Sequence, residues 1–388
     1  MACAVLCSAA LFGCDGSVQV VHDDPSEGLE SGHAATWLGL KAEGGFNGDG
    51  LFRTETQVSQ PQDLLFMPDG SAWFTDFNNF LIRRVLPDGT VETMVGGVDP
   101  IFPGDGPVGG IPMEGAPGLD WQLNHPTNLL RNFDDSSVLV VGWHNHKLLK
   151  VDPDDGFVKV VCGGGAGYAG DGEVAAGKAL FRQPNDATFD ADGNLYLIDQ
   201  QNARIRRIDT NGVITTVAGT GMPGYAGDGG PADAAQFSWA AGSNPNPSGG
   251  IVHHEGKLYI SDTEQDVIRV MDLETGLIDR FAGIGDGGYS GDGGEALNAR
   301  INAPRDLEIG PDGDLYFADT DNGSVRAIDL QTNEIRTVVG TGTLGLDEEE
   351  GKLATETALR RPFGIAFDPE GNLYVLDTLN DRVVKVAK

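Results

Sequence analysis

Three histidines in one part of the chain are the residues best suited to metal chemistry. His125 precedes a proline, and His144 and His146 flank Asn145 directly after Trp143. Imidazole nitrogens are preferred ligands of zinc and copper, and alternate residues of an extended chain point to the same side. A metal site is therefore one hypothesis, but we favour an exposed polar rim or a patch that contacts a ligand. The ligand-binding candidates here are His125, Trp143, His144 and His146, and the three histidines are the metal candidates.

A second set of polar side chains follows six prolines, each of which precedes an apolar segment. The prolines are Pro61, Pro126, Pro184, Pro247, Pro304 and Pro362, and the residues after them are Gln62, Thr127, Asn185, Ser248, Arg305 and Phe363. This mixture is a poor cage for a divalent ion, which needs several converging oxygen ligands. Asn185 and Arg305 are ligand-binding candidates.

The next position along each segment is more acidic. It is occupied by Asp63, Asn128, Asp186 and Asp306. These side chains could hold a cation, but we favour carboxylates that bond to the backbone where strands begin. The sequence shows no Ser-His-Asp order, nucleotide-binding loop or Cys-x-x-Cys pair.

The six prolines lie 57 to 65 residues apart and mark a repeat. Its third copy contains four expected strands, at 186–190, 195–199, 204–209 and 213–219. Asp-Gly and Asn-Gly pairs between such segments favour hairpins because these residues tolerate positive φ. A four-stranded meander repeated six times is typical of the blades of a β-propeller. The candidate residues are then expected on one face, around the mouth of a central channel.

The second strand of the unit carries the most specific motif. It ends in Asp with an Asn three residues later, as in Asp76 with Asn79, Asp199 with Asn202, Asp319 with Asn322 and Asp377 with Asn380. The pattern resembles the NHL-repeat family, which implies an all-β fold: a six-bladed β-propeller with four-stranded antiparallel blades. We interpret the Asp side chains as closing the turn through bonds to nearby backbone N–H groups. The second unit departs from the motif, with Gly142 in place of the Asp.

The last unit ends after three strands, so its fourth strand must come from elsewhere. The segment 36–40 (Thr-Trp-Leu-Gly-Leu) occupies the position of a fourth strand before the first glycine-rich loop. Pairing the two ends of the chain would remove the open edges of the sheet. We therefore predict that the N-terminal strand completes the last blade and that residues 34–388 form the propeller.

Glycine-rich connecting loops also recur, with the sequence Gly-x-x-Gly-Asp-Gly around Asp49, Asp171, Asp228 and Asp292. Calcium prefers hard oxygen ligands, but one carboxylate per loop is too few for a dedicated site. Ordering of the loop is therefore favoured over calcium binding. No cofactor is expected, and calcium or zinc is the alternative.

The composition and the first residues bear on location. The net charge of −32 argues against nucleic acid as a partner, because affinity for a phosphate backbone comes from clustered basic residues. A short apolar run ending in Leu-Phe-Gly before Cys14 resembles a bacterial lipoprotein signal peptide and is too short to span a bilayer. The resemblance implies a signal peptide at 1–13, lipidation at Cys14 and a flexible tether at 14–33, with plain secretion as the alternative. Cys162 is then the one thiol of the mature chain.

These features favour an exported, lipid-anchored recognition module on the bacterial cell envelope, facing the periplasm or the exterior. It would be non-catalytic and would bind a protein or glycan through its loop-rich face, where insertions at 98–125 and 234–247 carry Trp121 and Trp239. The alternative is a metal-dependent lactonase (a hydrolase) or a lyase that acts in the channel. Pro184-Asn185-Asp186 resembles a metal-binding motif of gluconolactonase-type propellers, and the related amidating lyases use histidine-bound zinc. The remaining positions match neither ligand set.

Overall fold

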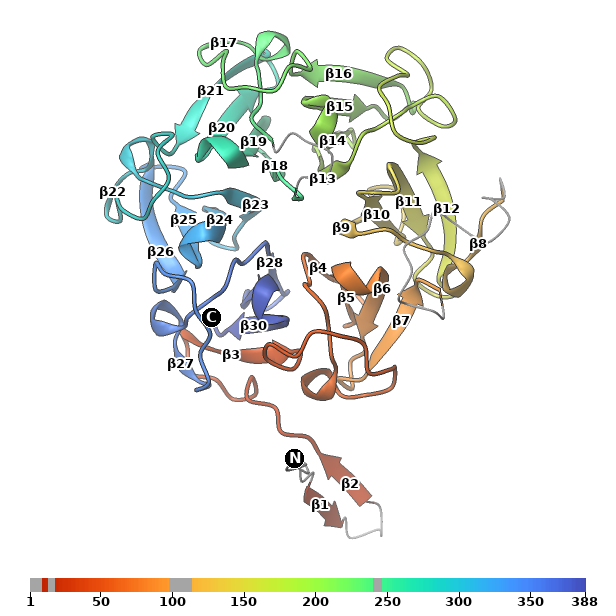
Figure 1. The fold of residues 1–388 in the computed structure, drawn as a ribbon, viewed down its shortest axis with the longest axis vertical. Helices are drawn as coiled ribbons and strands as arrows, with labels where there is room; N and C mark the ends of the chain where they lie inside the picture. Colours follow the sequence, from red (N-terminus) through yellow and green to blue (C-terminus); the bar gives the residue numbers. More distant parts are fainter. Residues whose placement is uncertain (1–8, 13–17, 98–113, 240–245) are drawn as a thin grey trace.

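The computed structural model describes residues 9–12, 18–97, 114–239 and 246–388 and shows six blades arranged around a central channel (Figure 1). Each blade is a meander of antiparallel strands that runs from the channel to the outer rim. The predicted all-β, six-bladed propeller is confirmed. Among the described residues, no helix is long and apolar enough to cross a membrane.

The strands of the first three blades begin close to the anchoring prolines. Blade 1 contains β4 (Leu64–Phe66), β5 (Ala72–Asp76), β6 (Leu81–Val85) and β7 (Val91–Val95). Blade 2 contains β9 (Pro126–Arg131), β10 (Val138–Gly142), β11 (Lys147–Val151) and β12 (Phe157–Cys162). Blade 3 contains β13 (Pro184–Phe189), β14 (Leu195–Asp199), β15 (Arg204–Ile208) and β16 (Ile214–Ala218).

The last three blades follow the same order. Blade 4 contains β18 (Ile251–His254), β19 (Lys257–Asp262), β20 (Val267–Asp272) and β21 (Leu277–Ala282). Blade 5 contains β23 (Pro304–Ile309), β24 (Leu315–Asp319), β25 (Ser324–Ile328) and β26 (Glu334–Gly340). Blade 6 contains β28 (Gly364–Phe367), β29 (Leu373–Asp377), β30 (Arg382–Val386) and β3 (His33–Leu38). A separate hairpin of β1 (Ala9–Phe12) and β2 (Val18–Val21) lies outside the ring (Figure 1).

The ring is closed by the two ends of the chain, as predicted. β3 pairs with β30 in antiparallel register, from Ala34 with Val386 to Leu38 with Val383. The strand therefore begins three residues before the expected segment. Glu350 fixes it from the neighbouring loop, because its carboxylate accepts hydrogen bonds from both the backbone N–H and the hydroxyl of Thr36, each 2.8 Å long.

Four blades have a short fifth strand that the sequence analysis did not predict. These strands are β8 (Ala116–Pro117), β17 (Gly230–Pro231), β22 (Gly294–Glu295) and β27 (Lys352–Leu353). Each comes from the loop that arrives from the preceding blade and pairs with the outermost strand. The loop thereby covers an edge that would otherwise present unpaired backbone groups. A 3-10 turn follows each of them: η3 (Gly118–Asp120), η5 (Ala232–Ala234), η7 (Ala296–Asn298) and η9 (Ala354–Glu356).

Hydrophobic side chains pack between neighbouring blades. One such cluster joins Trp73 of blade 1 to Val140 of blade 2, and another joins Leu376 of blade 6 to Phe74 of blade 1. Alternation along each strand supplies apolar residues to both faces of a blade, so every blade is buried against two others. The core is therefore a ring of interfaces, and it holds the inner strands at the channel.

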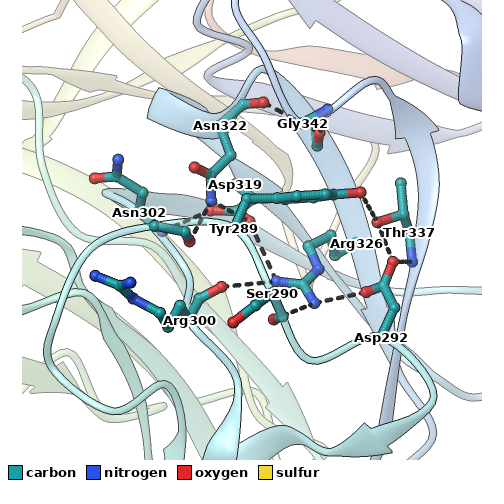
Figure 2. A network of polar contacts seen from close by, with 12 residues as sticks. Tyr289, Ser290, Asp292, Arg300, Asn302, Asp319, Asn322, Arg326, Thr337 and Gly342 are labelled. Carbon is teal, nitrogen blue, oxygen red and sulfur yellow. Dashed lines mark hydrogen bonds and ion pairs between the residues drawn. The ribbon is translucent and has the colours of Figure 1, made fainter.

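A buried network ties each glycine-rich loop to its blade, as Figure 2 shows for blade 5. The backbone N–H of Asn302 and the amide of Asn322 both donate to Asp319, with distances of 2.7 and 2.8 Å. Arg326 donates to the loop carboxylate of Asp292 at 2.6 Å and also faces Asp319 at 3.5 Å. The strand-end Asp thus closes its turn as predicted, and the loop Asp orders the loop by pairing with an arginine.

The same arrangement recurs around the ring, and the sequence analysis missed its arginines. Arg83, Arg206, Arg269, Arg326 and Arg382 are each at most 1% exposed and pair with the Asp at the end of the second strand of their blade. In four of these blades the arginine stands seven residues after that Asp. This spacing was the signal that could have revealed them. The turns that follow the Asp residues are η2 (Phe77–Asn79), η4 (Gln200–Asn202), η6 (Thr263–Gln265), η8 (Thr320–Asn322) and η10 (Thr378–Asn380).

Candidate functional site

Blade 2 lacks the Asp–Arg pair because its second strand ends in Gly142. A Cβ atom at this position would lie 2.9 Å from the Cβ of Asn145. Asn145 replaces the missing carboxylate: its Oδ1 accepts the N–H of Asn124 at 2.8 Å, as Asp76 accepts the N–H of Ser59 in blade 1. The break in the motif is therefore a local substitution that preserves the turn.

Two of the three candidate histidines meet beside this turn. The Nδ1 atoms of His125 and His144 are 3.0 Å apart. The ring of His125 contacts Phe77 and Phe80 of blade 1, with centroids 4.6 and 4.7 Å away, and His144 stacks on Trp143 at 4.0 Å. These five side chains are called the aromatic cluster below. They join blade 1 to blade 2.

The aromatic cluster is uncharged at neutral pH. Burial, with a smaller contribution from His144, lowers the pKa of His125 to about 4, and burial followed by His146 lowers the pKa of His144 to about 4. A hydrogen bond between two Nδ1 atoms also requires one of them to lack a proton. Trp143 is 2% exposed and its Nε1–H donates to Oε1 of Gln200 at 2.9 Å. These contacts give the cluster a packing role between blades.

The third histidine has a different partner. Nδ1 of His146 accepts the N–H of Gln183 at 3.0 Å, where the chain enters blade 3. Within the described part of the chain, no three His, Cys, Asp or Glu side chains are grouped so that they could hold a metal ion. The structure thus brings together two of the three metal candidates and gives the third a backbone partner.

The second candidate set gathers at the mouth of the central channel, as expected. A cavity of about 40 Å³ is lined there by residues from all six blades: Gln62 and Asp63, Thr127 and Asn128, Asn185 and Asp186, Pro247 and Gly249, Arg305 and Asp306, and Phe363. Both predicted ligand-binding candidates of this set, Asn185 and Arg305, line the cavity. The expectation for Ser248 was wrong by one residue, because Ser248 is fully buried and blade 4 places Gly249 in the lining.

A ring of carboxylates lies one residue further along the inner strands. Oδ1 of Asp186 accepts the N–H of Ala187 at 2.7 Å, and its Oδ2 accepts the N–H of Ile251 in blade 4 at 2.7 Å. Asp63 of blade 1 and Asp306 of blade 5 make the same two bonds, so alternate blades each brace the next one. These contacts agree with the favoured interpretation, in which the carboxylates bond to the backbone.

Burial is the main cause of a raised pKa in each of these carboxyl groups. Burial, followed by the charge of Asp306, raises the pKa of Asp63 and Asp186 well above the usual range, and burial raises the pKa of Asp306 to about 6. Glu308 joins them from the same side of β23, and burial followed by Asp306 raises its pKa well above the usual range. Glu308 is partly buried. The sequence analysis missed it, although alternation along the strand places it beside Asp306.

Arg305 dominates the upper layer of the cavity. Its side chain is 5% exposed, and its guanidinium lies over the ring of Phe363 at 4.1 Å. Burial, and secondarily the charge of Arg361, lowers the pKa of Arg305 to about 9, so it remains protonated at neutral pH. The mouth therefore carries a cation above a layer of carboxyl groups.

Four polar atoms in the cavity lining have no hydrogen-bond partner within the described residues. They are Nε2 of Gln62, Oδ1 of Asn128, Oδ1 of Asn185 and Nε of Arg305. Two are donors and two are acceptors, and they come from blades 1, 2, 3 and 5. Buried polar atoms are nearly always paired, so a concentration of unpaired ones marks a place where a polar ligand or water belongs.

The chain is weakly similar to proteins with NHL repeats. No family model matches it. It is 26% identical over 277 residues to Protein SUPPRESSOR OF QUENCHING 1, chloroplastic, of Arabidopsis thaliana, covering 68% of this chain and 25% of that protein. It is 33% identical over 131 residues to NHL repeat-containing protein 2 of Gallus gallus, covering 34% and 17%. The chain thus spans a quarter or less of the length of these relatives, and the matches support the resemblance to NHL-repeat proteins.

Solved structures of the same fold include both binding proteins and enzymes. An auxiliary nutrient binding protein from Bacteroides ovatus superimposes with a TM-score of 0.62 at 16% identity, covering 97% of this chain and 82% of that one. A gluconolactonase from Xanthomonas campestris superimposes with a TM-score of 0.50 at 12% identity, covering 85% and 86%. At these identities the likeness shows the fold alone, and function has to be argued from the site.

Proposed function

We propose that this chain is a non-catalytic binding module that holds a glycan across the mouth of its central channel. The observation that carries the proposal is the set of four unpartnered polar atoms around one cavity. Sugar hydroxyls both donate and accept hydrogen bonds, so one ligand can satisfy donors and acceptors together. A cavity of about 40 Å³ holds about three waters, so it admits one substituent of a sugar while the rest of the glycan lies across the rim.

Two further observations support binding over catalysis. The ring carboxylates of Asp63, Asp186 and Asp306 already accept backbone hydrogen bonds from two blades, which gives them a structural role. The nutrient-binding propeller described above has this fold, which makes a binding role a reasonable analogy. A protein ligand is the alternative occupant of the same face.

A binding assay with matched variants tests the proposal. Wild-type protein is expected to bind at least one oligosaccharide on a glycan array, and the double variant Gln62→Ala/Asn185→Ala is expected to weaken that binding at least tenfold by calorimetry. Asn211→Ala is the control, since Asn211 is an exposed residue of a blade 3 turn away from the channel mouth. Loss of binding in the control as well, or a wild-type protein that binds no glycan, contradicts the proposal.

The module is further proposed to be lipid-anchored at Cys14 on the cell envelope, facing the periplasm or the exterior. Cys14 lies outside the described residues, so this part rests on the sequence. Cys14→Ala is expected to move the protein from the membrane fraction of a bacterial host to the soluble fraction. A variant that stays with the membranes, or a wild type that is already soluble, contradicts anchoring.

One observation favours a second candidate function, a hydrolase or lyase that acts in the channel. Burial, followed by the charge of Asp306, raises the pKa of Glu308, and its carboxyl group forms no hydrogen bond within the described residues. A protonated carboxyl is suited to general acid catalysis. The purified protein should then open a lactone substrate, and Glu308→Gln should lose turnover. Neither result is expected from a binding module.

A further inference from the structure

Arg305 is the exception among the buried arginines. Six arginines of the described residues are at most 5% exposed. Five of them face a strand-end Asp in their own blade. Arg305 forms no ion pair in the described part of the chain, and its guanidinium contacts the face of Phe363. A buried charge without a counter-charge is strongly unfavourable, so this guanidinium is suited to an anion that comes from outside the chain.

A second cation stands beside it. Arg361 precedes the proline of blade 6, and its guanidinium lies 5.8 Å from the ring of Phe363. The Nε of Arg361 donates a hydrogen bond to Asp321 at 2.6 Å. The charges of Asp321 and Glu264 reach Arg305 only at a distance. The planar fork of Arg305 is therefore open to the bidentate hydrogen bonding that carboxylates accept.

The amides around Arg305 add a second requirement to the ligand. The Nδ2 of Asn185 donates to the carbonyl of Gly249 at 2.6 Å, and the Nδ2 of Asn128 donates to Asp63 at 3.2 Å. These bonds fix the orientation of both amides and leave their Oδ1 atoms, which belong to residues that line the cavity, without a hydrogen-bond partner within the described residues. The Nε2 of Gln62 remains as a donor. The complementary ligand thus has an acceptor group for Arg305 and Gln62 and a hydroxyl group that donates to Asn185 or Asn128.

The carboxylate ring limits the charge of that ligand. Asp63, Asp186 and Asp306 line the same cavity as Arg305, and Glu308 interacts electrostatically with all three of them. Any of these carboxyl groups that is ionised repels a doubly charged anion such as phosphate more strongly than a monoanion. The small cavity also excludes a bulky anionic group.

From this arrangement we infer that the channel mouth recognises a carboxylate with a neighbouring hydroxyl, as in a uronic acid residue of an acidic glycan, with the carboxylate on Arg305. The inference rests on the proposed function and narrows it from glycans in general to acidic ones. Free 2-hydroxy acids share this chemistry, so the experiment compares both sources.

Calorimetry at pH 7 with D-glucuronate, D-glucuronamide, lactate and phosphate tests the inference. D-Glucuronate is expected to bind at least tenfold more tightly than its neutral amide and than phosphate, and more tightly than lactate because the glycan ring adds contacts at the rim. Arg305→Gln should weaken D-glucuronate binding at least tenfold. Arg300→Gln, which removes an exposed arginine paired with Asp286, should leave it unchanged.

Thermal unfolding without ligand separates a ligand-binding role of Arg305 from a structural one. Removing an unpaired buried charge should leave the melting temperature of Arg305→Gln equal to or above that of the wild type, whereas a structural arginine would lower it. Equal affinity for glucuronate and glucuronamide, with weakening of both by Gln62→Ala, overturns the carboxylate inference and leaves the proposed function standing. Tighter binding of lactate than of glucuronate overturns the glycan source. A melting temperature lowered in Arg305→Gln together with no binding of any probe overturns both proposals.

Discussion

Replacing Arg326 with methionine should destabilise the propeller by about 3–5 kcal/mol, the usual consequence of removing one partner of a buried ion pair. Arg326 is fully buried and donates to the backbone carbonyls of Arg300 and Ser290, each at 3.0 Å, in addition to its two carboxylate partners (Figure 2). Methionine fills much of the same volume, so the expected loss comes from the polar groups left behind. Urea unfolding followed by tryptophan fluorescence measures it.

The larger part of that loss is assigned to Asp319, which has no exposed surface. Burial already raises the pKa of Asp319 to about 7 against the lowering effects of Asn322, Asn302 and Arg326. Without the arginine the pKa rises further, so the folded state must take up a proton or bury an unpaired charge at neutral pH. The free-energy loss in Arg326→Met should therefore be smaller at pH 5 than at pH 8.

A second substitution and a control complete the test. Adding Asp319→Asn to Arg326→Met should restore about 1 kcal/mol or more, because the charge is gone and the amide oxygen still accepts the N–H of Asn302. Arg336→Met, in which the lost pairs are with Asp312 and Asp314 and the arginine side chain is 41% exposed, should change stability by at most about 1 kcal/mol. Equal losses in Arg326→Met and Arg336→Met, or a double variant no more stable than the single one, would refute the reasoning.

Three further outcomes are expected. The pKa is raised to about 6 for Asp306 and to about 7 for Asp319, so the stability that these buried carboxyls contribute is fully present below the pKa of an Asp in the unfolded chain and is lost as the pH rises towards 7. Urea midpoints measured from pH 4 to 8 should therefore fall with pH, and Glu308→Gln should make this fall less steep. A midpoint that rises with pH would contradict the prediction. Gly364→Ala should lower the free energy of unfolding by about 1–3 kcal/mol, because the added Cβ would lie 2.0 Å from a backbone oxygen of blade 1. Gly294→Ala is the control: Gly294 is exposed, the atom nearest to the added Cβ is 3.3 Å away, and the free energy of unfolding should change by less than about 1 kcal/mol. Deleting residues 1–38 removes β3 and opens an edge of the sheet, so this protein should aggregate. Deleting residues 1–21 should leave a monodisperse propeller, and light scattering compares the two. Equal behaviour of the two truncations would argue against closure by β3.

Several features of the fold could be predicted from the sequence because they depend on short stretches of chain. The spacing of the prolines sets the number of blades, and the Asp-Gly and Asn-Gly turns set the hairpins within each blade. The Asp76–Asn79 type of turn was also predictable, since both partners lie three residues apart. The closure of the ring by the N-terminal strand was also predictable from the number of strands in each unit, because the last unit lacked one strand.

The partners of individual polar groups were decided only by the tertiary structure. Arg326 meets Asp292 across 34 residues, and Asp186 braces a strand 65 residues away, so neither contact leaves a trace in a local pattern. The same holds for Arg305: its residue type was visible in the sequence, but its lack of a counter-charge was not. Whether a charge is paired depends on all the side chains that several blades bring to one point. The sequence by itself therefore determined the ring and the position of its mouth, and only the packing of the blades decided which of the groups at that mouth are left open for a ligand.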